Sequence, residues 1–329
     1  MTGNLLNISH YFYSIFKEDF IGYLEYKASC GYKSDSIEFQ LVRFDRFCFE
    51  KNITLHEVTK ALYTEWITEI CQNVCPSTKY SYIRNINNLC KYLTDHGIYA
   101  YHENYIHTAS MFGRYTPHIY SLVEIRKFKQ ATLKAIALMP NNQVAKMFPM
   151  IFTLLYGCGL RIGEALSITK DDIDIEAKTI RIIDGKGGVS RLLPLSNDTM
   201  ESLSRFIDTF HPNGIKQFLF CNKTNKKHID VANCYYHFRK VLTLAGIPHL
   251  GKGKGPRLHD FRHTFAVTSL RLFLKKGVKT RVAIVYISRY LGHSSPEMTE
   301  YYIHLCPECI PAMQEHMDKI SEELFGGAE

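Results

Sequence analysis

The stretch from Arg257 to His304 constrains the chain more than any other part of it. His259 and Arg262 are three residues apart in a run whose apolar residues recur at helical spacing, so both side chains project from one helical face. His293 follows a glycine, and Tyr302 comes nine residues after it. Arginine and histidine side chains can hold the charge that grows on phosphate oxygens, and a phenol can attack phosphorus. This stretch predicts chemistry on a phosphodiester without a metal or another cofactor.

Two neighbouring residues compete for these roles. Tyr301 precedes Tyr302, and by composition alone either tyrosine can be the nucleophile. His263 follows Arg262 directly, and one residue corresponds to about 100° around a helix. We therefore expect His263 to point away from the face that His259 and Arg262 share.

The spacing of these pieces resembles the tyrosine recombinases, the phage-integrase family. The family pattern is His-x-x-Arg, then Leu-Gly-His, then a tyrosine nine residues on that is followed by one residue and a histidine. In this chain the pieces are His259-Asp-Phe-Arg262, Leu-Gly-His at 291–293, and Tyr302-Ile-His304. The nine-residue spacing and the Ile-His that follows favour Tyr302 over Tyr301.

Two earlier segments also resemble the family. The segment GCGLRIGEAL at 157–166 is similar to the motif of the first catalytic arginine, with Glu164 as the acid that supports Arg161. Taken alone, this arginine and glutamate would be an ordinary pair on one helix face. Lys186 lies in a glycine-rich turn between two expected strands, where a lysine is usually only solvated. In the family a lysine at this position protonates the leaving 5′ oxygen.

The resemblance implies a mechanism and a site. Tyr302 would form a 3′-phosphotyrosyl link, the two arginines would clamp the phosphate oxygens, and His259 would transfer the proton at the nucleophile. His293 would be a further donor to the phosphate. The implied catalytic residues are Arg161, Lys186, His259, Arg262, His293 and Tyr302. Arg262 and His293 are 31 positions apart, a spacing similar to that in integrases of transposable elements.

Two other activities compete with recombination. A type IB topoisomerase uses the same chemistry but only nicks, relaxes and reseals DNA. A regulator that has lost catalysis would bind DNA without cutting it. The filled catalytic positions argue against such a loss, and a helical domain ahead of a compact catalytic domain suits recombination better than relaxation.

The expected fold is mainly α-helical with a small antiparallel β-sheet. The first hundred residues predict helices alone, over 12–28, from Ser34 or Ser36 to about 49, over 55–72, and after Pro76 with Ser77 as its N-cap. This half resembles the helical core-binding domain of the family. The predicted organisation is a helical DNA-binding domain at 1–104, a linker at 105–117, and an α+β catalytic domain at 118–329 that ends in a helix.

The fourth predicted helix carries a polar set on the faces away from its apolar stripe. A solvated face is the ordinary interpretation of such a set. The resemblance instead makes this stretch the last long helix of the core-binding domain, which contacts DNA through cations, amides and phenols. The set consists of Lys79, Tyr82, Arg84, Asn87 and Lys91.

The second half begins with a capping box, Ser121 to Glu124. Residues 147–156 are apolar enough to be buried, and from residue 172 the apolar period changes to two. Isoleucines at 173 and 175, isoleucines at 180 and 182, and leucines at 193 and 195 predict the three strands. Helices are expected over 197–210 and 231–246, with a short buried segment at 218–222.

The basic charge lies in the second half. The net charge is +8, yet the first hundred residues hold ten Lys or Arg against eleven Asp or Glu. Residues 213–257 hold nine basic residues and a single acid, which predicts a polyanionic partner. We expect the glycine-rich loop with Lys252, Lys254 and Arg257 to lie along the DNA backbone.

Several classes are excluded by the sequence. It has no apolar run of membrane-spanning length and no signal-peptide start, so we expect a cytoplasmic protein. Two close cysteine pairs, Cys71 with Cys75 and Cys306 with Cys309, are candidates for zinc, but no histidine or cysteine lies at finger spacing around the first pair, so no metal site is predicted. The resemblance implies double-stranded DNA as the partner and a homotetramer on two DNA sites, with accessory DNA-bending proteins left open. An apolar stripe after residue 309 predicts a C-terminal helix that packs on its own domain or on a neighbouring subunit.

Overall fold

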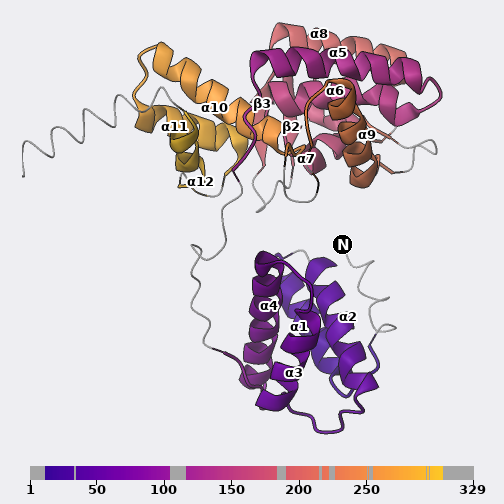
Figure 1. The fold of residues 1–329 in the computed structure, drawn as a ribbon, viewed down its shortest axis with the longest axis vertical. Helices are drawn as coiled ribbons and strands as arrows, with labels where there is room; N and C mark the ends of the chain where they lie inside the picture. The colour runs from indigo at the N-terminus through magenta and orange to yellow at the C-terminus, as the bar shows by residue number, and fades with distance from the viewer. Residues whose placement is uncertain are drawn as a thin grey trace, which may run out of the picture. The chain divides into compact units, whose positions relative to one another are not determined.

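The structure is a computed structural model that describes residues 12–32, 35–103, 116–183, 190–214, 217–221, 227–249, 251, 255–293, 295 and 297–306. The chain divides into two compact units, Met1–Arg114 and Tyr115–Glu329 (Figure 1). The predicted fold class is confirmed, because the described residues form helices and one three-stranded antiparallel sheet. None of the helices in these ranges is long and apolar enough to span a membrane.

The first unit is a group of four helices around an aromatic core. They are α1 (Lys17–Ser29), α2 (Asp35–Glu50), α3 (Lys60–Ile70) and α4 (Pro76–Asp95). Phe16, Phe20 and Phe44 are almost completely buried, and the Phe44 ring packs against Trp66 at 5.3 Å between centroids. Thr59 caps α3 by accepting a hydrogen bond from the Leu62 N–H.

Two details of α4 differ from the prediction. The helix starts at Pro76 with Cys75 as its N-cap, not at Ser77, because proline at the first position needs no hydrogen-bond partner for its nitrogen. Asn87 does not face solvent: its side chain accepts a hydrogen bond from the Tyr63 hydroxyl and donates one to the Glu103 carbonyl. These bonds satisfy a buried amide, so Asn87 serves the core rather than a DNA surface.

The larger core of the second unit is built from α5 (Leu122–Leu138), α6 (Gln143–Gly157), α8 (Asn197–Phe210) and α9 (Val231–Leu244). The predicted capping box of α5 is confirmed, with Ser121 and Glu124 bonding each other's backbone N–H groups. The apolar α6 packs against α5, α8 and α9, which explains its nearly all-apolar sequence. The predicted buried segment is also present, with Leu219 and Phe220 fully buried.

The sheet follows the predicted change of period. Its strands are β1 (Ile173–Asp174), β2 (Thr179–Ile182) and β3 (Arg191–Pro194), in the order β1-β2-β3. In the register, Ile180 is opposite Leu193, and both are buried. Ile175 differs from the prediction, since it lies beyond β1 and is exposed. The turn between β2 and β3, with Lys186, lies outside the described residues.

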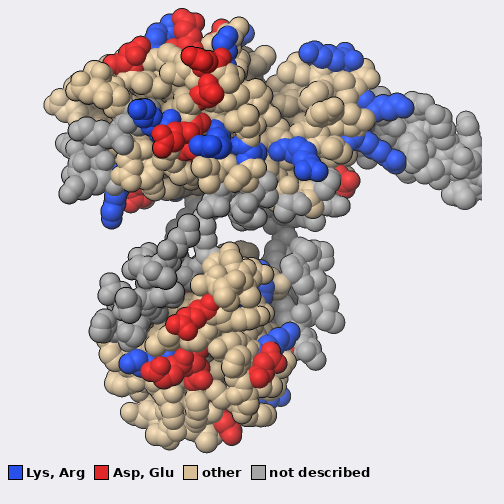
Figure 2. Space-filling model, turned by 180° about the vertical axis from the view of Figure 1, so that it is seen from behind, with Lys and Arg blue, Asp and Glu red and all other residues tan. Residues whose placement is uncertain are grey.

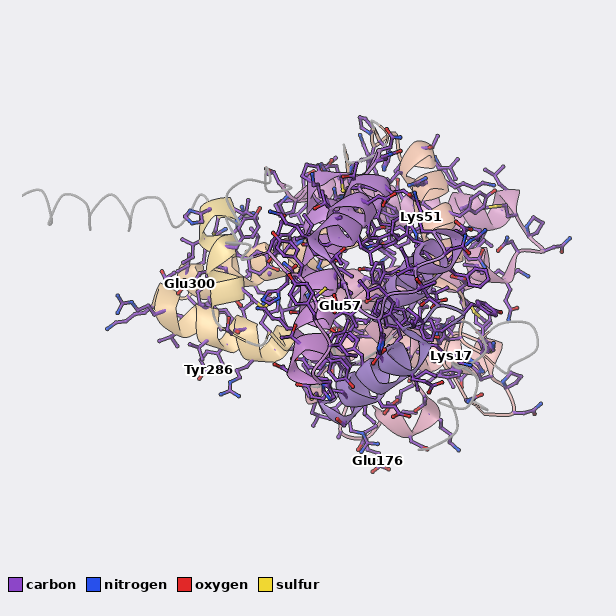
Figure 3. The ribbon with its side chains drawn as sticks, turned by 90° about the horizontal axis from the view of Figure 1, so that it is seen from below. Lys17, Lys51, Glu57, Glu176, Tyr286 and Glu300 are labelled. Carbon is purple, nitrogen blue, oxygen red and sulfur yellow. The ribbon has the colours of Figure 1, made fainter. Side chains whose placement is uncertain are left out.

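The helix α10 (Asp260–Lys275), shown in Figure 1, contributes residues to two hydrophobic cores. Its first turn places Phe261 in the larger core, and its later residues Ala266 and Leu270 belong to a smaller core with α11 (Thr280–Leu291). The chain then forms α12 (Glu297–Glu300) and a 3-10 turn, η4 (Tyr301–Leu305). Glu300, labelled in Figure 3, is the last residue of α12. The start of α10 therefore lies where the cores meet, and the predicted C-terminal helix lies outside the described residues.

Candidate active site

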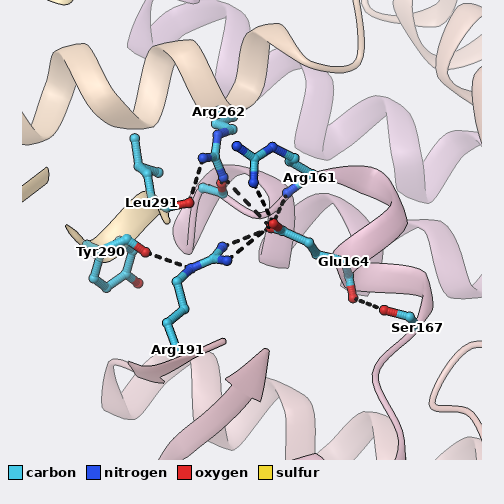
Figure 4. A network of polar contacts seen from close by, with 8 residues as sticks. Arg161, Glu164, Ser167, Arg191, Arg262, Tyr290 and Leu291 are labelled. Carbon is cyan, nitrogen blue, oxygen red and sulfur yellow. Dashed lines mark hydrogen bonds and ion pairs between the residues drawn. The ribbon is translucent and has the colours of Figure 1, made fainter. Parts of the chain in front are cut away.

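Glu164 gathers three arginine side chains in the second unit (Figure 4). Its carboxylate is 2.7 Å from Nη1 of Arg161 and accepts two hydrogen bonds from Arg191, at 2.8 and 3.2 Å. Nη1 of Arg262 lies 3.8 Å from the same carboxylate. The Glu164 side chain is 6% exposed, so these contacts form in a low-dielectric environment where an unpaired charge is costly.

The backbone between α6 and α7 (Ile162–Leu166) creates this arrangement. Gly159 has a φ of +62°, a left-handed conformation that turns the chain sharply after α6. Arg161 is the N-cap of α7, and its N–H donates to the Glu164 carboxylate at 3.0 Å. The same carboxylate therefore caps the helix and pairs with the arginines.

Alanine at Gly159 is expected to destabilise the second unit by about 2 to 4 kcal/mol, from the left-handed backbone and from overpacking. A Cβ there would lie 2.6 Å from Phe265 and 2.9 Å from Leu291. Thermal unfolding followed by far-UV circular dichroism checks this expectation. Gly163→Ala is the matched control, because a Cβ at Gly163 meets no atom within 4 Å and alanine favours the helix. Equal melting temperatures for the two variants would contradict the expectation.

Arg262 is the most buried cation of this group, with 1% of its surface exposed. Its guanidinium donates to the Gly159 carbonyl at 2.8 Å and to the Leu291 carbonyl at 2.6 Å. Burial, together with the nearby Arg161, lowers the pKa of Arg262 to about 10, so it remains charged at neutral pH. Arg262 thus ties the first turn of α10 to the turn after α6 and to the end of α11.

The arginines and a backbone N–H lower the pKa of Glu164 to about 2 although burial alone would raise it. Because the folded-state pKa lies below the unfolded value, the stabilisation is complete above about pH 4.5 and is lost as the pH falls toward 2. We expect this carboxylate to account for about 3 kcal/mol of acid destabilisation of the second unit. Urea unfolding at several pH values checks this, since Glu164→Gln should remove that part of the pH dependence. An unchanged dependence would contradict it.

The Tyr302 hydroxyl is held by a histidine. Tyr302 lies in η4 with 3% of its surface exposed, and its Oη is 3.1 Å from Nδ1 of His263. Burial raises the pKa of Tyr302, while the charges of Arg262 and Arg161 act in the opposite direction. Burial lowers the pKa of His263, with Asp260 raising it and Arg262 lowering it further. At neutral pH the phenol and the imidazole therefore meet in their uncharged forms.

The expectation that His263 points away from the site is wrong. It counted one residue from Arg262, but His263 is four residues after His259, which is about 40° past a full turn. Positions four apart lie on the same helix face. The ring of His259 accordingly packs edge-on against His263, with centroids 4.9 Å apart.

His293 lies directly after the left-handed Gly292 that ends α11. Its Nδ1 is 2.7 Å from the Thr299 hydroxyl, and its ring is 6.3 Å from that of Tyr302. Burial first, and then the surrounding arginines and His263, lower the pKa of His293 to about 4. The ring is therefore neutral at pH 7 and carries one N–H.

The structure brings five of the six predicted catalytic residues into one site. Arg161 and Arg262 meet at Glu164, and the Leu291 carbonyl that Arg262 binds is two residues before His293. His259 reaches the site through its contact with His263, and Tyr302 completes it. Lys186, the sixth, lies outside the described residues.

Arg191 was missed by the sequence analysis. It is the first residue of β3, its side chain is 7% exposed, and its Nε donates to the Tyr290 carbonyl at 2.9 Å. Alternation along the strand could have identified it, because Arg191 shares a strand face with the buried Leu193. An arginine on an apolar face needs a buried acid, and Glu164 is that acid.

The predicted DNA-contact residues are only partly described. Lys79 and Arg84 are exposed on α4, and the half-buried Tyr82 accepts a hydrogen bond from Arg43 at 3.3 Å. Arg257 is exposed just before α10, where its N–H donates to the Asp260 carboxylate at 2.8 Å. The other two residues, Lys252 and Lys254, lie outside the described residues.

A second basic surface covers α10 and α11. From Phe261 to Pro296 the sequence has no Asp or Glu. Figure 2 shows basic side chains on this lobe, whereas both signs are interspersed on the first unit. The sequence analysis placed the basic block at 213–257 and overlooked this second one, which the absence of acids could have revealed. The basic residues of the α10 and α11 surface outside the active site are Arg271, Lys275, Lys276, Lys279, Arg281 and Arg289.

Comparison with known proteins identifies relatives along most of the chain. A Sinorhizobium fredii protein named as an integrase/recombinase is 26% identical over 326 residues, which cover 94% of this chain and 99% of that protein. A tyrosine recombinase of Pseudothermotoga lettingae is 26% identical over 294 residues, covering 85% of this chain and 88% of its own.

Solved structures share the fold. The Tn1549 transposon integrase in complex with transposon right end DNA has a TM-score of 0.60 at 16% identity, covering 91% of this chain and 99% of that chain. The XerH site-specific recombinase bound to a palindromic difH substrate has a TM-score of 0.59 at 20% identity, covering 82% and 75%. Residues 127–308 match the phage integrase family. The resemblance seen in the sequence is confirmed, and this chain belongs to the phage integrase family, the tyrosine recombinases.

Proposed function

We propose that this protein is a site-specific recombinase that integrates and excises a mobile element by cutting and rejoining DNA through a 3′-phosphotyrosyl intermediate. One observation carries the proposal: the Tyr302 hydroxyl lies among histidines beside an arginine pair that a buried carboxylate holds in place. Such a constellation supplies a nucleophile, proton carriers and fixed positive charge for a phosphoryl transfer.

Each predicted residue has a role in this mechanism. The Tyr302 oxygen attacks phosphorus, and the 5′ oxygen leaves with a proton from Lys186. Arg161 and Arg262 bind the non-bridging oxygens, since planar guanidinium donors suit a phosphate. His293 donates the one N–H of its neutral ring to the phosphate, and His259 takes part in proton transfer at the nucleophile.

Burial of the site implies a movement before catalysis. Tyr302 is 3% and Arg262 is 1% exposed, whereas the Arg161 side chain is 18% exposed. A phosphate of duplex DNA can therefore meet Arg161 first, and it can reach the other two only after the residues that cover them move aside. In this proposal the site opens only when DNA binds, so Tyr302 and Arg262 stay covered in the protein without DNA.

The partner is double-stranded DNA, bound by both units. We assign DNA binding to the helical domain at 1–104, a linker role to 105–117, and catalysis to 118–329. The charges on α10 and α11 add to the electrostatic attraction for phosphates. Exchange between two duplexes calls for a homotetramer, and we place its activity in the cytoplasm. The proposed contacts are Lys79, Tyr82, Arg84, Lys252, Lys254 and Arg257.

The test is formation of a covalent protein-DNA adduct. The full chain is incubated, in the presence of EDTA, with nicked duplexes that carry the ends of its element, and the mixture is denatured. We expect an adduct with the parent and with Tyr301→Phe, and none with Tyr302→Phe. An adduct with Tyr302→Phe would move the nucleophile elsewhere. Salt-sensitive DNA binding by the parent without any adduct would favour a DNA-binding regulator instead.

A further inference from the structure

We infer that His263 is the residue that takes the hydroxyl proton of Tyr302 as this tyrosine attacks DNA. The inference rests on the proposed recombinase function and assigns a catalytic role to a residue outside the six predicted ones. In this step the Tyr302 O–H bond breaks, the proton moves to Nδ1 of His263, and the phenol oxygen bonds to phosphorus as the 5′ oxygen leaves. Rejoining reverses the step, and the proton returns to Tyr302.

The geometry meets the first requirement for a general base. The two reacting atoms, Oη of Tyr302 and Nδ1 of His263, are 3.1 Å apart, within direct hydrogen-bond reach. The ring of His293 is also near Tyr302, but its Nδ1 is engaged with the Thr299 hydroxyl at 2.7 Å. Among the histidines described in the site, His263 thus holds the position from which a proton can be taken directly.

Hydrogen bonds anchor the helix turn that carries His263. It lies in the first turn of α10, where the Asp260 carboxylate accepts hydrogen bonds from the N–H groups of Arg257 and His118. The next residue, Thr264, accepts one from the Tyr120 N–H at 3.1 Å. A base held on a well-anchored helix turn keeps its alignment with the nucleophile, which is what efficient proton transfer needs.

The surroundings keep His263 ready to accept. The charged and titratable groups that face it are Asp260 and Arg262 on its own helix, His259 before it, His293 after α11, and Tyr302 in η4. Burial and Arg262 lower its pKa, against the opposing effect of Asp260. A neutral imidazole with its N–H on Nε2 leaves Nδ1 free to accept the phenol hydrogen.

His259 then has a second place in the same chain of proton carriers. Its ring is exposed and packs edge-on against His263 at 4.9 Å. It is more exposed than the half-buried His263, so it is a positioning residue that steadies the base and can pass the proton outward. This arrangement explains why two histidines stand one helical turn apart at the start of α10.

The test measures the single-turnover rate of adduct formation on the nicked duplex. His263→Asn keeps a hydrogen-bonding group near the position of Nδ1 but cannot take a proton at neutral pH, and His263→Gln is the second variant. We expect each to slow the step by about 10² or more, the usual effect of losing a general base. His228→Gln, a histidine in the same unit whose ring bonds to its own backbone neighbour, is the control and should match the parent.

A fluorinated tyrosine at position 302 tests whether His263 acts as a base or only supports the structure. Its lower phenol pKa reduces the need for a base, so we expect it to shrink the defect of His263→Asn by about tenfold or more. The pKa of His263 lies below the ordinary value for histidine. The parent rate should fall as the pH drops through this pKa, because a protonated His263 cannot accept the phenol proton. The variants should lack this pH dependence.

Adduct formation by both His263 variants at the parent rate, or a defect that fluorination leaves unchanged, would overturn the inference. A faster reaction in the variants would also overturn it and would make His263 a restraint on Tyr302. If the parent itself forms no adduct, the proposed function fails first. The two failures are therefore distinguishable by the parent and Tyr302→Phe reactions run beside the variants.

Discussion

Glutamine in place of Glu164 is expected to lower the unfolding free energy of the second unit by about 3 to 5 kcal/mol, the usual cost of removing one partner from a buried ion pair. The carboxylate caps α7 and pairs with three arginines, two of which are almost fully buried. Without it, Arg191 and Arg262 keep their charges in a low-dielectric environment with no compensating acid. This is the largest change in stability that we expect from a single substitution.

A double-mutant cycle isolates the part of this free energy that comes from the interaction between Glu164 and Arg191. Arg191→Met fills the space of the arginine with an apolar chain, so Glu164→Gln should cost less in that background than in the parent. Urea unfolding followed by far-UV circular dichroism gives the free energies. Trp66 is the single tryptophan and lies in the first unit, so its fluorescence should report an unchanged transition there.

A surface pair provides the control. Glu201 and Arg205 form an ion pair at 3.1 Å on α8 with both side chains 67% exposed, so Glu201→Gln should cost no more than about 0.5 kcal/mol. If Glu164→Gln costs as little as the surface control, the carboxylate is not the centre of the site that its contacts indicate.

The sequence predicted the fold well where local rules govern it. The capping box at Ser121 and the apolar alternation of β2 and β3 act over a few residues, and both are present in the structure. The start of α4 and the orientation of Asn87 were predicted wrongly. A polar residue near an apolar stripe faces the core when a distant partner satisfies it, and Tyr63 is separated from Asn87 by 24 residues.

The site was predictable in its members but not in its connections. Resemblance to the family identified Arg161, Arg262, His293 and Tyr302, because their motifs have the residue types and the spacing of the family pattern. It did not reveal that Arg191 on β3 reaches Glu164 on α7, since pairing between elements depends on how they pack. His263 was overlooked because the helical angle was counted from Arg262 rather than from His259.

Lysine in place of Arg262 is expected to slow adduct formation by about 10² to 10³, comparable to the loss of one oxyanion-stabilising donor. The charge is retained, but the fork of donors is not. Arg262 binds the Gly159 and Leu291 carbonyls with two different nitrogens while staying 3.8 Å from Glu164. The single ammonium group of lysine has to give up at least one of these contacts. The alignment of a phosphate oxygen with the side chain is then lost as well.

The expected defect lies in the chemical step rather than in binding. DNA affinity should change by no more than a few-fold, because the net charge is unchanged and attraction to phosphates depends mainly on it. The measurement is therefore the single-turnover adduct rate at saturating nicked duplex, with the dissociation constant determined at the same salt concentration. Thermal unfolding of the variant separates lost alignment from lost folding.

Arg281→Lys is the matched control, because this substitution makes the same chemical change at an exposed position on α11, outside the site. It should react at the parent rate. A parent-like rate for Arg262→Lys would mean that position 262 supplies only charge, and the hydrogen bonds to the two carbonyls would then serve the fold alone. A slow rate with normal affinity would assign to Arg262 the placement of the phosphate, because the two side chains carry the same charge but differ in the geometry of their donors.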